Sequence, residues 1–141
     1  MKYILSILLL LASHSSFAQI IKKPTDMECL VYAVYKESRG SDLPQMRAVI
    51  DVIQNRATES GESICNVLKK KSQFPYFKFG VKKVHDRKFL TMFMNAYTMK
   101  PVLTDKNYLF FNTKKFKWCG KTRKVQKMYF CKLKEKNNGK H

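Results

Sequence analysis

Apolar residues recur at helical spacing through the first two thirds of the chain. Thr25 and Glu28 form a Thr-x-x-Glu capping box before the first such stretch, which predicts a helix over 26–39. Pro44 suits the first turn of a second helix, which the polar segment 58–62 would end. The apolar residues of this second helix follow at intervals of three and four: Met46, Val49, Ile50, Ile53 and Ala57.

Two further helices and an irregular stretch are predicted next. A short helix over 63–71 leads into an aromatic, irregular segment over 73–84. Pro101 would stop a fourth helix, which Asp86 can cap and whose apolar face carries Phe89, Leu90, Phe93 and Tyr97.

The last third of the chain changes to an extended pattern. Segments 108–112 and 116–118 are predicted to be extended, and Cys-Gly-Lys-Thr at 119–122 is predicted to turn the chain toward a segment over 125–133. No repeat or linker interrupts residues 19–141. We therefore expect one mainly α (α+β) domain with a small C-terminal β element.

The first residues have the pattern of a signal peptide. Lys2 precedes an apolar stretch over 4–12, and the small residues Ser16 and Ala18 stand three and one positions before the expected cut. A membrane anchor is the alternative, but a spanning helix needs roughly 20 apolar residues. The sequence therefore predicts an exported protein, periplasmic or extracellular, whose mature chain is 19–141.

All four cysteines lie in the exported part, where two disulfides are expected. Of the three possible connectivities, pairs between neighbouring segments are preferred, namely Cys29 with Cys65 and Cys119 with Cys131. None of the spacings is the Cys-x-x-Cys of a structural zinc site. We expect no metal and no cofactor.

The mature chain is strongly basic. Without Lys2 it has 27 Lys and Arg residues against 10 Asp and Glu, a net charge of +17. Nucleic acid, anionic lipid or a bacterial wall could attract such a chain, and the charge could also serve solubility alone. Lys-rich runs at 69–71 and 114–127 keep a nucleic-acid or membrane binder open, although no nucleic-acid-binding motif accompanies them.

Glu37 is the candidate for acid–base chemistry. It shares the apolar face of the first predicted helix with Leu30, Ala33 and Val34, so its carboxylate would face the core or a cleft. Desolvation and the negative end of its own helix would both raise its pKa, which suits a general acid. Alternatively, Glu37 pairs with Arg39 or Arg56 and only ties two helices together.

The first half of the mature chain resembles the SleB-type cell-wall hydrolases, the family of spore-cortex-lytic enzymes. Cys29-Leu-Val-Tyr-Ala-Val-Tyr-Lys-Glu-Ser-Arg-Gly is similar to that family's Cys-Leu-Ala-x-x-x-Tyr-x-Glu-Ala-Arg-Gly. Ala48-Val-Ile-Asp-Val-Ile-Gln-Asn-Arg56 resembles its Ala-Val-x-x-Val-x-x-Asn-Arg, and Ile64-Cys-Asn-Val-Leu its Val-Cys-x-Val-Val. Gln73-Phe74 falls where the family has Gln-Phe-Ser-Trp.

The second half departs from the family's pattern. Where such proteins carry Ala-Thr-His-Tyr-His, this chain has Phe110 and Asn112 at the positions of the histidines and Phe111 at that of the tyrosine. Trp118 could match the tryptophan that follows. These changes affect the expected sugar-contacting residues more than the acid.

The resemblance implies a lysozyme-like fold that binds peptidoglycan glycan strands and the anionic wall surface as a monomer. Cleavage would fall between N-acetylmuramic acid and N-acetylglucosamine, with Glu37 as the catalytic acid and base. A lytic transglycosylase needs this one carboxylate because the muramyl C6 hydroxyl is the nucleophile. Asn55 and Arg56 would support Glu37, with helix-end capping as their alternative, and the substrate-binding residues would be Gln73, Phe74, Tyr108, Phe111 and Trp118.

Other functions stay open at this point. Asp42 or Asp51 could activate a water, which would make the enzyme a plain hydrolase. Tyr76 is a further candidate for the groove, although core packing is the simpler interpretation of any single aromatic. With His85 the only histidine between the signal and the last residue, chemistry that needs two histidines is disfavoured. A basic wall-binding protein without catalytic activity is the main alternative, because Phe110 and Asn112 replace histidines.

Overall fold

The computed structural model describes residues 22–70 and 74–134. The signal peptide and Gln73 lie outside these residues. The described part is mainly helical with a small C-terminal sheet, which confirms the predicted fold class. Its elements are α1 (Asp26–Ser38), α2 (Leu43–Ser60), α3 (Ile64–Lys69), the 3-10 helix η1 (Pro75–Phe79), α4 (Arg87–Thr98), β1 (Tyr108–Asn112), β2 (Lys121–Val125) and β3 (Met128–Lys132).

The helices begin at the capping residues that the sequence indicates. Thr25 Oγ1 accepts from the Glu28 amide at 3.2 Å, and the Glu28 carboxylate accepts from the Thr25 amide at 2.7 Å, so the capping box is formed. Asp86 caps α4 by accepting from the Phe89 amide at 2.9 Å. Each cap satisfies amide groups that have no partner within the helix.

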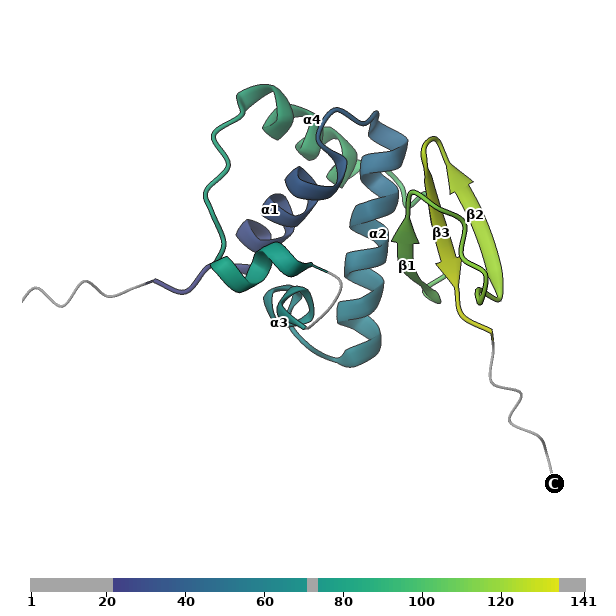
Figure 1. Ribbon diagram of the computed structural model, residues 1–141. Helices are drawn as coiled ribbons and strands as arrows, with labels where there is room; N and C mark the ends of the chain where they lie inside the picture. The colour runs from purple at the N-terminus through teal and green to yellow at the C-terminus, as the bar shows by residue number, and fades with distance from the viewer. Residues whose placement is uncertain (1–21, 71–73, 135–141) are drawn as a thin grey trace, which may run out of the picture.

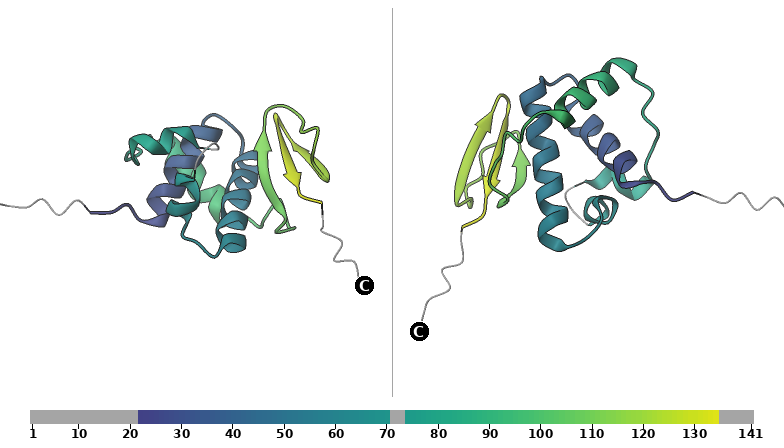
Figure 2. Two further views of the ribbon diagram at one scale, coloured as in Figure 1. Left: turned by 60° about the horizontal axis from the view of Figure 1, so that its bottom comes forward. Right: turned by 180° about the vertical axis from the view of Figure 1, so that it is seen from behind.

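Helix α2 runs through the middle of the molecule, with α1 and α4 on one side and the sheet on the other (Figures 1 and 2). It is the central element because its own apolar side chains are buried on most sides of the helix. Its fully buried residues include Met46, Val49, Ile50, Val52 and Ile53. Gly61 ends the helix in a left-handed conformation with φ of 65°, which glycine adopts without strain.

The sheet is antiparallel with the strand order β1-β3-β2. The predicted strand over 108–112 is confirmed as β1, but 116–118 forms no strand. The predicted turn at 119–122 is also wrong, because β2 begins at Lys121 and the chain turns at Gln126 and Lys127 instead. Strand β2 is an edge strand and mostly polar, so only its register with β3 distinguishes it from a loop.

Two disulfides connect neighbouring segments, as predicted. Cys29 in α1 bonds to Cys65 in α3, and Cys119 before β2 bonds to Cys131 in β3. Both bonds indicate an oxidising environment such as that outside the cytoplasm. Within residues 22–70 and 74–134, no helix is long and apolar enough to cross a membrane.

Candidate active site

Glu37 lies in the last turn of α1 and lines a cavity of about 430 Å³. The carboxylate is half-buried, as its place on the apolar face of the helix predicts. The cavity has a helical wall, which consists of Glu37 and Phe74. Its other wall, here called the strand wall, comes from β1, the segment after it and the start of β3, and consists of Phe110, Phe111, Asn112, Thr113, Phe116, Trp118 and Met128.

The nearest polar partner of Glu37 is Tyr76 of η1. The Tyr76 hydroxyl donates a hydrogen bond to Glu37 Oε1 at 2.7 Å. Aromatic contacts orient the Tyr76 ring, with Tyr32 edge-on at 5.8 Å and Phe77 at 5.4 Å between ring centroids. Sequence reasoning named Tyr76 only as a possible groove residue, because its bond to Glu37 depends on how η1 folds back against α1.

The surroundings of Glu37 favour its protonated form. Burial raises the pKa of the Glu37 carboxyl above its usual range, and the hydrogen bond from Tyr76 and the charge of Lys36 offset part of this rise. The negative end of α1 acts in the same direction as burial. A carboxyl of this kind can hold a proton closer to neutral pH than an exposed glutamate, which is what a general acid requires.

Tyr76 stays a hydrogen-bond donor in this arrangement. Burial and the neighbouring Glu37 carboxylate both raise the pKa of the Tyr76 hydroxyl far above its usual range, so it remains protonated. Its proton is directed at Oε1 of Glu37. The exchangeable proton of Glu37 therefore belongs on Oε2, the oxygen that Tyr76 does not occupy.

Glu37 takes no part in an ion pair within the described residues. Arg39 instead reaches Asp86, with Arg39 Nε 3.7 Å from Asp86 Oδ2, and stacks over Tyr35 at 5.0 Å from the ring centroid. Arg56 binds a backbone carbonyl, as described below. The alternative in which Glu37 only ties two helices together through an arginine is not what the structure contains.

The outer part of the strand wall is a group of edge-to-face aromatic rings. Trp118 lies 5.3 Å from Phe110 and 5.3 Å from Phe116, measured between ring centroids, at steep interplanar angles. The Trp118 side chain is 57% exposed, so much of its surface is open to a ligand. Rings held by one another but open to solvent suit the stacking of a sugar, because little side-chain entropy is lost on binding.

Asn55 and Arg56 bind the backbone just before the strand wall rather than Glu37. Asn55 Nδ2 donates to the carbonyls of Asp105 and Tyr108 at 3.3 and 3.1 Å. Arg56 Nε donates to the carbonyl of Leu109. Neither residue caps the end of a helix, since both lie inside α2.

The Arg56 guanidinium also connects the two walls of the cavity. It lies over the rings of Phe74 and Phe110, at 5.6 and 4.9 Å from their centroids. Burial lowers the pKa of Arg56 to about 10, so the group is still charged at neutral pH. The support that Asn55 and Arg56 were expected to give Glu37 is indirect: they bind the backbone that leads into the strand wall, and Arg56 lies over Phe110.

The two other candidate carboxylates have structural roles. Asp42 caps α2 by accepting from the Gln45 amide at 3.1 Å. Asp51, predicted to lie off the apolar stripe of α2, is 3% exposed and accepts from Arg47 Nε at 2.8 Å. Its second oxygen accepts from the amides of Val102 and Leu103. Neither carboxylate lines the cavity of Glu37.

Three of the predicted substrate-binding residues meet at the cavity and one does not. Phe74, Phe111 and Trp118 line it together with Glu37. Tyr108 is buried in the core and lines a separate cavity beside Asp105. The reason is its place at the first position of β1, about 10 Å along the strand from Phe111.

Phe116 is a wall residue that the sequence analysis did not name. The signal available was the predicted extended segment over 116–118, in which Phe116 would share a face with Trp118. In the structure this segment is irregular, yet both rings line the cavity. Phe110 and Asn112, the two positions that depart from the family pattern, both line the cavity.

A comparison of the chain with protein-family models, curated proteins and solved structures finds no significant match.

Proposed function

We propose that this protein is an exported, SleB-like enzyme that cleaves peptidoglycan between N-acetylmuramic acid and N-acetylglucosamine, as a lytic transglycosylase. One observation carries the proposal. The Glu37 carboxyl is half-buried, hydrogen-bonded by Tyr76 and open to an aromatic cavity. Among the described residues that line this cavity, Glu37 is the only acid. A mechanism with one protein carboxylate is therefore the one that these residues support best.

The reaction begins with Glu37 as the acid. Oε2 of Glu37 gives its proton to the glycosidic oxygen as the bond from that oxygen to C1 of the muramyl sugar breaks. The Glu37 carboxylate that results then takes the proton of the muramyl C6 hydroxyl. The C6 oxygen bonds to C1, which closes a 1,6-anhydro ring and returns Glu37 to its protonated state.

Tyr76 and the strand wall assist at different points. The Tyr76 hydroxyl stabilises the Glu37 carboxylate during the interval between the two proton transfers, because it stays a donor throughout. The rings of Phe110, Phe116 and Trp118 offer stacking surfaces for sugars of the glycan strand. The high positive charge draws the enzyme toward the anionic wall.

The test is digestion of purified peptidoglycan sacculi by the oxidised mature chain, with the fragments analysed by mass spectrometry. We expect fragments that end in 1,6-anhydro-muramyl groups. Glu37→Gln should lower their rate of release by about 10²–10⁴-fold, since it removes the proton donor. Glu59→Gln is the matched control, because it makes the same chemical change on an exposed side chain of α2.

Two results would refute this mechanism. Reducing ends in place of anhydro ends would mean that water is the nucleophile. No release by the wild-type chain, with retention on sacculi, would favour a wall-binding protein that is not an enzyme. The observation behind this second candidate is that Phe110 and Asn112, which stand where the family has histidines, line the cavity itself.

A further inference from the structure

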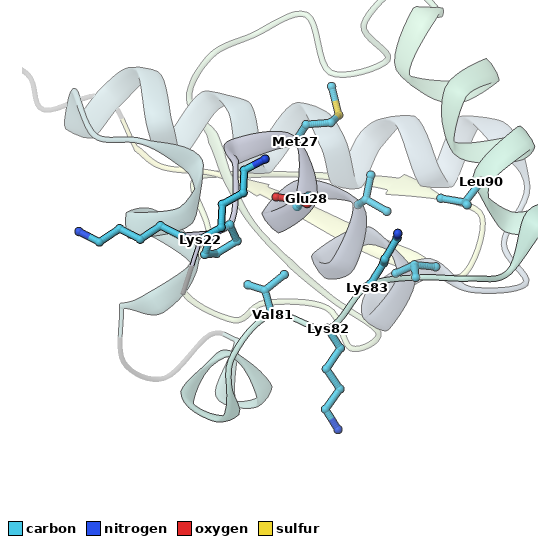
Figure 3. Close-up of a pocket in the computed structure, with 11 residues that line it drawn as sticks. Lys22, Met27, Glu28, Val81, Lys82, Lys83 and Leu90 are labelled. Atoms are coloured by element: carbon cyan, nitrogen blue, oxygen red, sulfur yellow. The ribbon is translucent and has the colours of Figure 1, made fainter. Parts of the chain in front are cut away.

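A second cavity lies at the other end of α1, away from Glu37. It measures about 470 Å³, and its apolar lining comes from four segments: the residues before α1, α1 itself, the stretch between η1 and α4, and α4. Figure 3 shows Met27, Val81 and Leu90 around it. The apolar residues that line it are Pro24, Met27, Val31, Val81, Val84 and Leu90.

Lysines surround this cavity. Lys22 and Lys23 come from the segment before α1, and Lys82 and Lys83 from the segment after η1. The ion pairs of the described residues use none of these four. In Figure 3, Lys82 extends outward from the cavity. The charges of Lys22 and Lys83 act on the Glu28 carboxylate.

The one acid in the lining offsets only one of these four charges. Glu28 is held by Thr25, whose amide and hydroxyl donate to its Oε2 at 2.7 and 3.0 Å. These hydrogen bonds lower the pKa of Glu28. Four lysines against a single carboxylate leave the face strongly positive.

Exposed apolar side chains lie in or next to the segments that form this cavity. Phe79, at the end of η1 and two residues before Val81, is 74% exposed, and Met27 is 41% exposed. Lys78 lies over the Phe79 ring at 4.7 Å from its centroid. An exposed aromatic among cations is the pattern with which proteins attach to anionic bilayers, where the ring enters the headgroup boundary and the ammonium groups meet lipid phosphates.

We propose that the face formed by Lys22, Lys23, Lys82 and Lys83, together with Phe79 from the adjoining end of η1, docks onto the surface of an anionic phospholipid bilayer. The charge complementarity favours a bilayer over a single small anion, because the four lysines come from two separate segments and would meet several headgroups at once. In Figure 1 this face and the sheet lie at opposite ends of the molecule. A docked molecule would thus leave the strand wall and Glu37 free. This proposal does not depend on the proposed enzymatic activity.

The first test is sedimentation of the mature chain with vesicles. We expect retention on phosphatidylglycerol–phosphatidylcholine vesicles, loss of retention at high salt, and little retention on phosphatidylcholine alone. Lys82→Gln/Lys83→Gln should weaken binding by on the order of tenfold or more, since each basic residue at such a surface contributes roughly fivefold. Lys106→Gln/Lys127→Gln is the control pair, because both residues are exposed and lie outside this cavity.

Equal losses for the two pairs would overturn the proposal, because the attraction would then depend on total charge alone. Equal retention on the two kinds of vesicle would also overturn it. So would uptake of a soluble anionic amphiphile by a chain that does not sediment with vesicles.

The second test locates the contact. Phe79→Trp in a Trp118→Phe background leaves one indole at position 79, whereas the wild-type chain has one at Trp118. Brominated lipids should quench the fluorescence of the variant several-fold more than that of the wild type. Quenching of Trp118 instead, with none at position 79, would place the bilayer against the sheet and contradict the proposal. Because Phe79 is exposed, the substitution should leave the fold intact.

Discussion

The two walls of the Glu37 cavity are built in different ways. The helical wall is held by side chains and by a disulfide: Cys29 ties α1 to α3, and the Tyr76 hydroxyl fixes the carboxylate of Glu37. The strand wall is held mainly through the backbone that leads into it, since Asn55 and Arg56 bind the carbonyls of Asp105, Tyr108 and Leu109. The Cys119–Cys131 disulfide holds its outer part.

This difference bears on which residues can change. A wall held through its carbonyls can exchange its side chains without losing its position, because every residue type carries the same acceptor. The strand wall is also where the chain departs from the resembled family, at Phe110 and Asn112. The helical wall keeps the residues that match that family's pattern, as the proposed role of Glu37 requires.

The largest expected effect is the loss of stability when either disulfide is removed, and it differs between the two. Cys29→Ser/Cys65→Ser should lower the free energy of unfolding by about 4 kcal/mol, and Cys119→Ser/Cys131→Ser by about 3 kcal/mol, because the first bond closes a longer loop. The sequence separations are 36 and 12 residues. Urea unfolding of the two double variants measures both values.

The Cys119→Ser/Cys131→Ser variant should lose more activity than its loss of stability alone would cause. Cys119 adjoins Trp118, so the loss of its bond frees the outer part of the strand wall. If the Cys119–Cys131 variant keeps full activity on sacculi, this part of the wall does not need to be held. If it proves the less stable of the two, the separate roles given to the bonds are wrong.

The helical wall could be predicted from the sequence much further than the strand wall. Thr25 and Asp86 each cap the helix that directly follows them, and the apolar spacing around Glu37 lies within one helix, so local rules suffice for them. The strand wall depends on pairing across the sheet. The mostly polar Lys121–Val125 becomes a strand only by its register with Met128–Lys132, which the sequence pattern does not reveal.

The same difference between local and long-range signals explains which features of the candidate site could be predicted. Glu37 was predictable because a carboxylate on an apolar helix face is conspicuous. The partners of Asn55 and Arg56 were not, because they lie about fifty residues away in sequence and are backbone atoms. Tyr108 differs from Phe111 only in its place along β1, and local sequence does not say which end of a strand reaches a cavity.

Arg56 is the link between the walls, and its removal is the next effect in size. Arg56→Met should lower the free energy of unfolding by about 2–3 kcal/mol, through loss of a charged hydrogen bond to Leu109 and of the stacking on Phe74 and Phe110. Thermal and urea unfolding measure the loss. Activity should fall as well, because the two walls are no longer joined.

Two comparison variants isolate this role. Arg56→Lys should lie between Arg56→Met and the wild type, since an ammonium keeps the charge but not the planar group. Arg87→Met makes the same change as Arg56→Met at an exposed position of α4 and should alter stability by less than about 0.5 kcal/mol. Similar losses for Arg56→Met and Arg87→Met would remove the case for a link.

The smallest expected effect is a shift in the pH profile of activity when the Tyr76 hydroxyl of the helical wall is removed. Tyr76→Phe removes a hydrogen bond that lowers the pKa of Glu37, so this pKa should rise further above its usual range. The first step needs protonated Glu37, and kcat/KM therefore falls as the pH rises through the pKa. The alkaline limb of the pH profile should move to higher pH in the variant. Tyr129→Phe, the same change in β3, should leave the limb in place.

The pH profile distinguishes this role of Tyr76 from simple packing. Loss of the hydroxyl should cost about 1 kcal/mol of stability in either case. A merely structural Tyr76 would lower the rate at every pH by one factor and leave the limb unmoved. A raised pKa in the folded state also means that Glu37 favours folding at acid pH and opposes it as the pH rises through that pKa. Tyr76→Phe should therefore destabilise the protein more at neutral than at acid pH, and equal losses at both would contradict the hydrogen bond as the means by which the helical wall controls its acid.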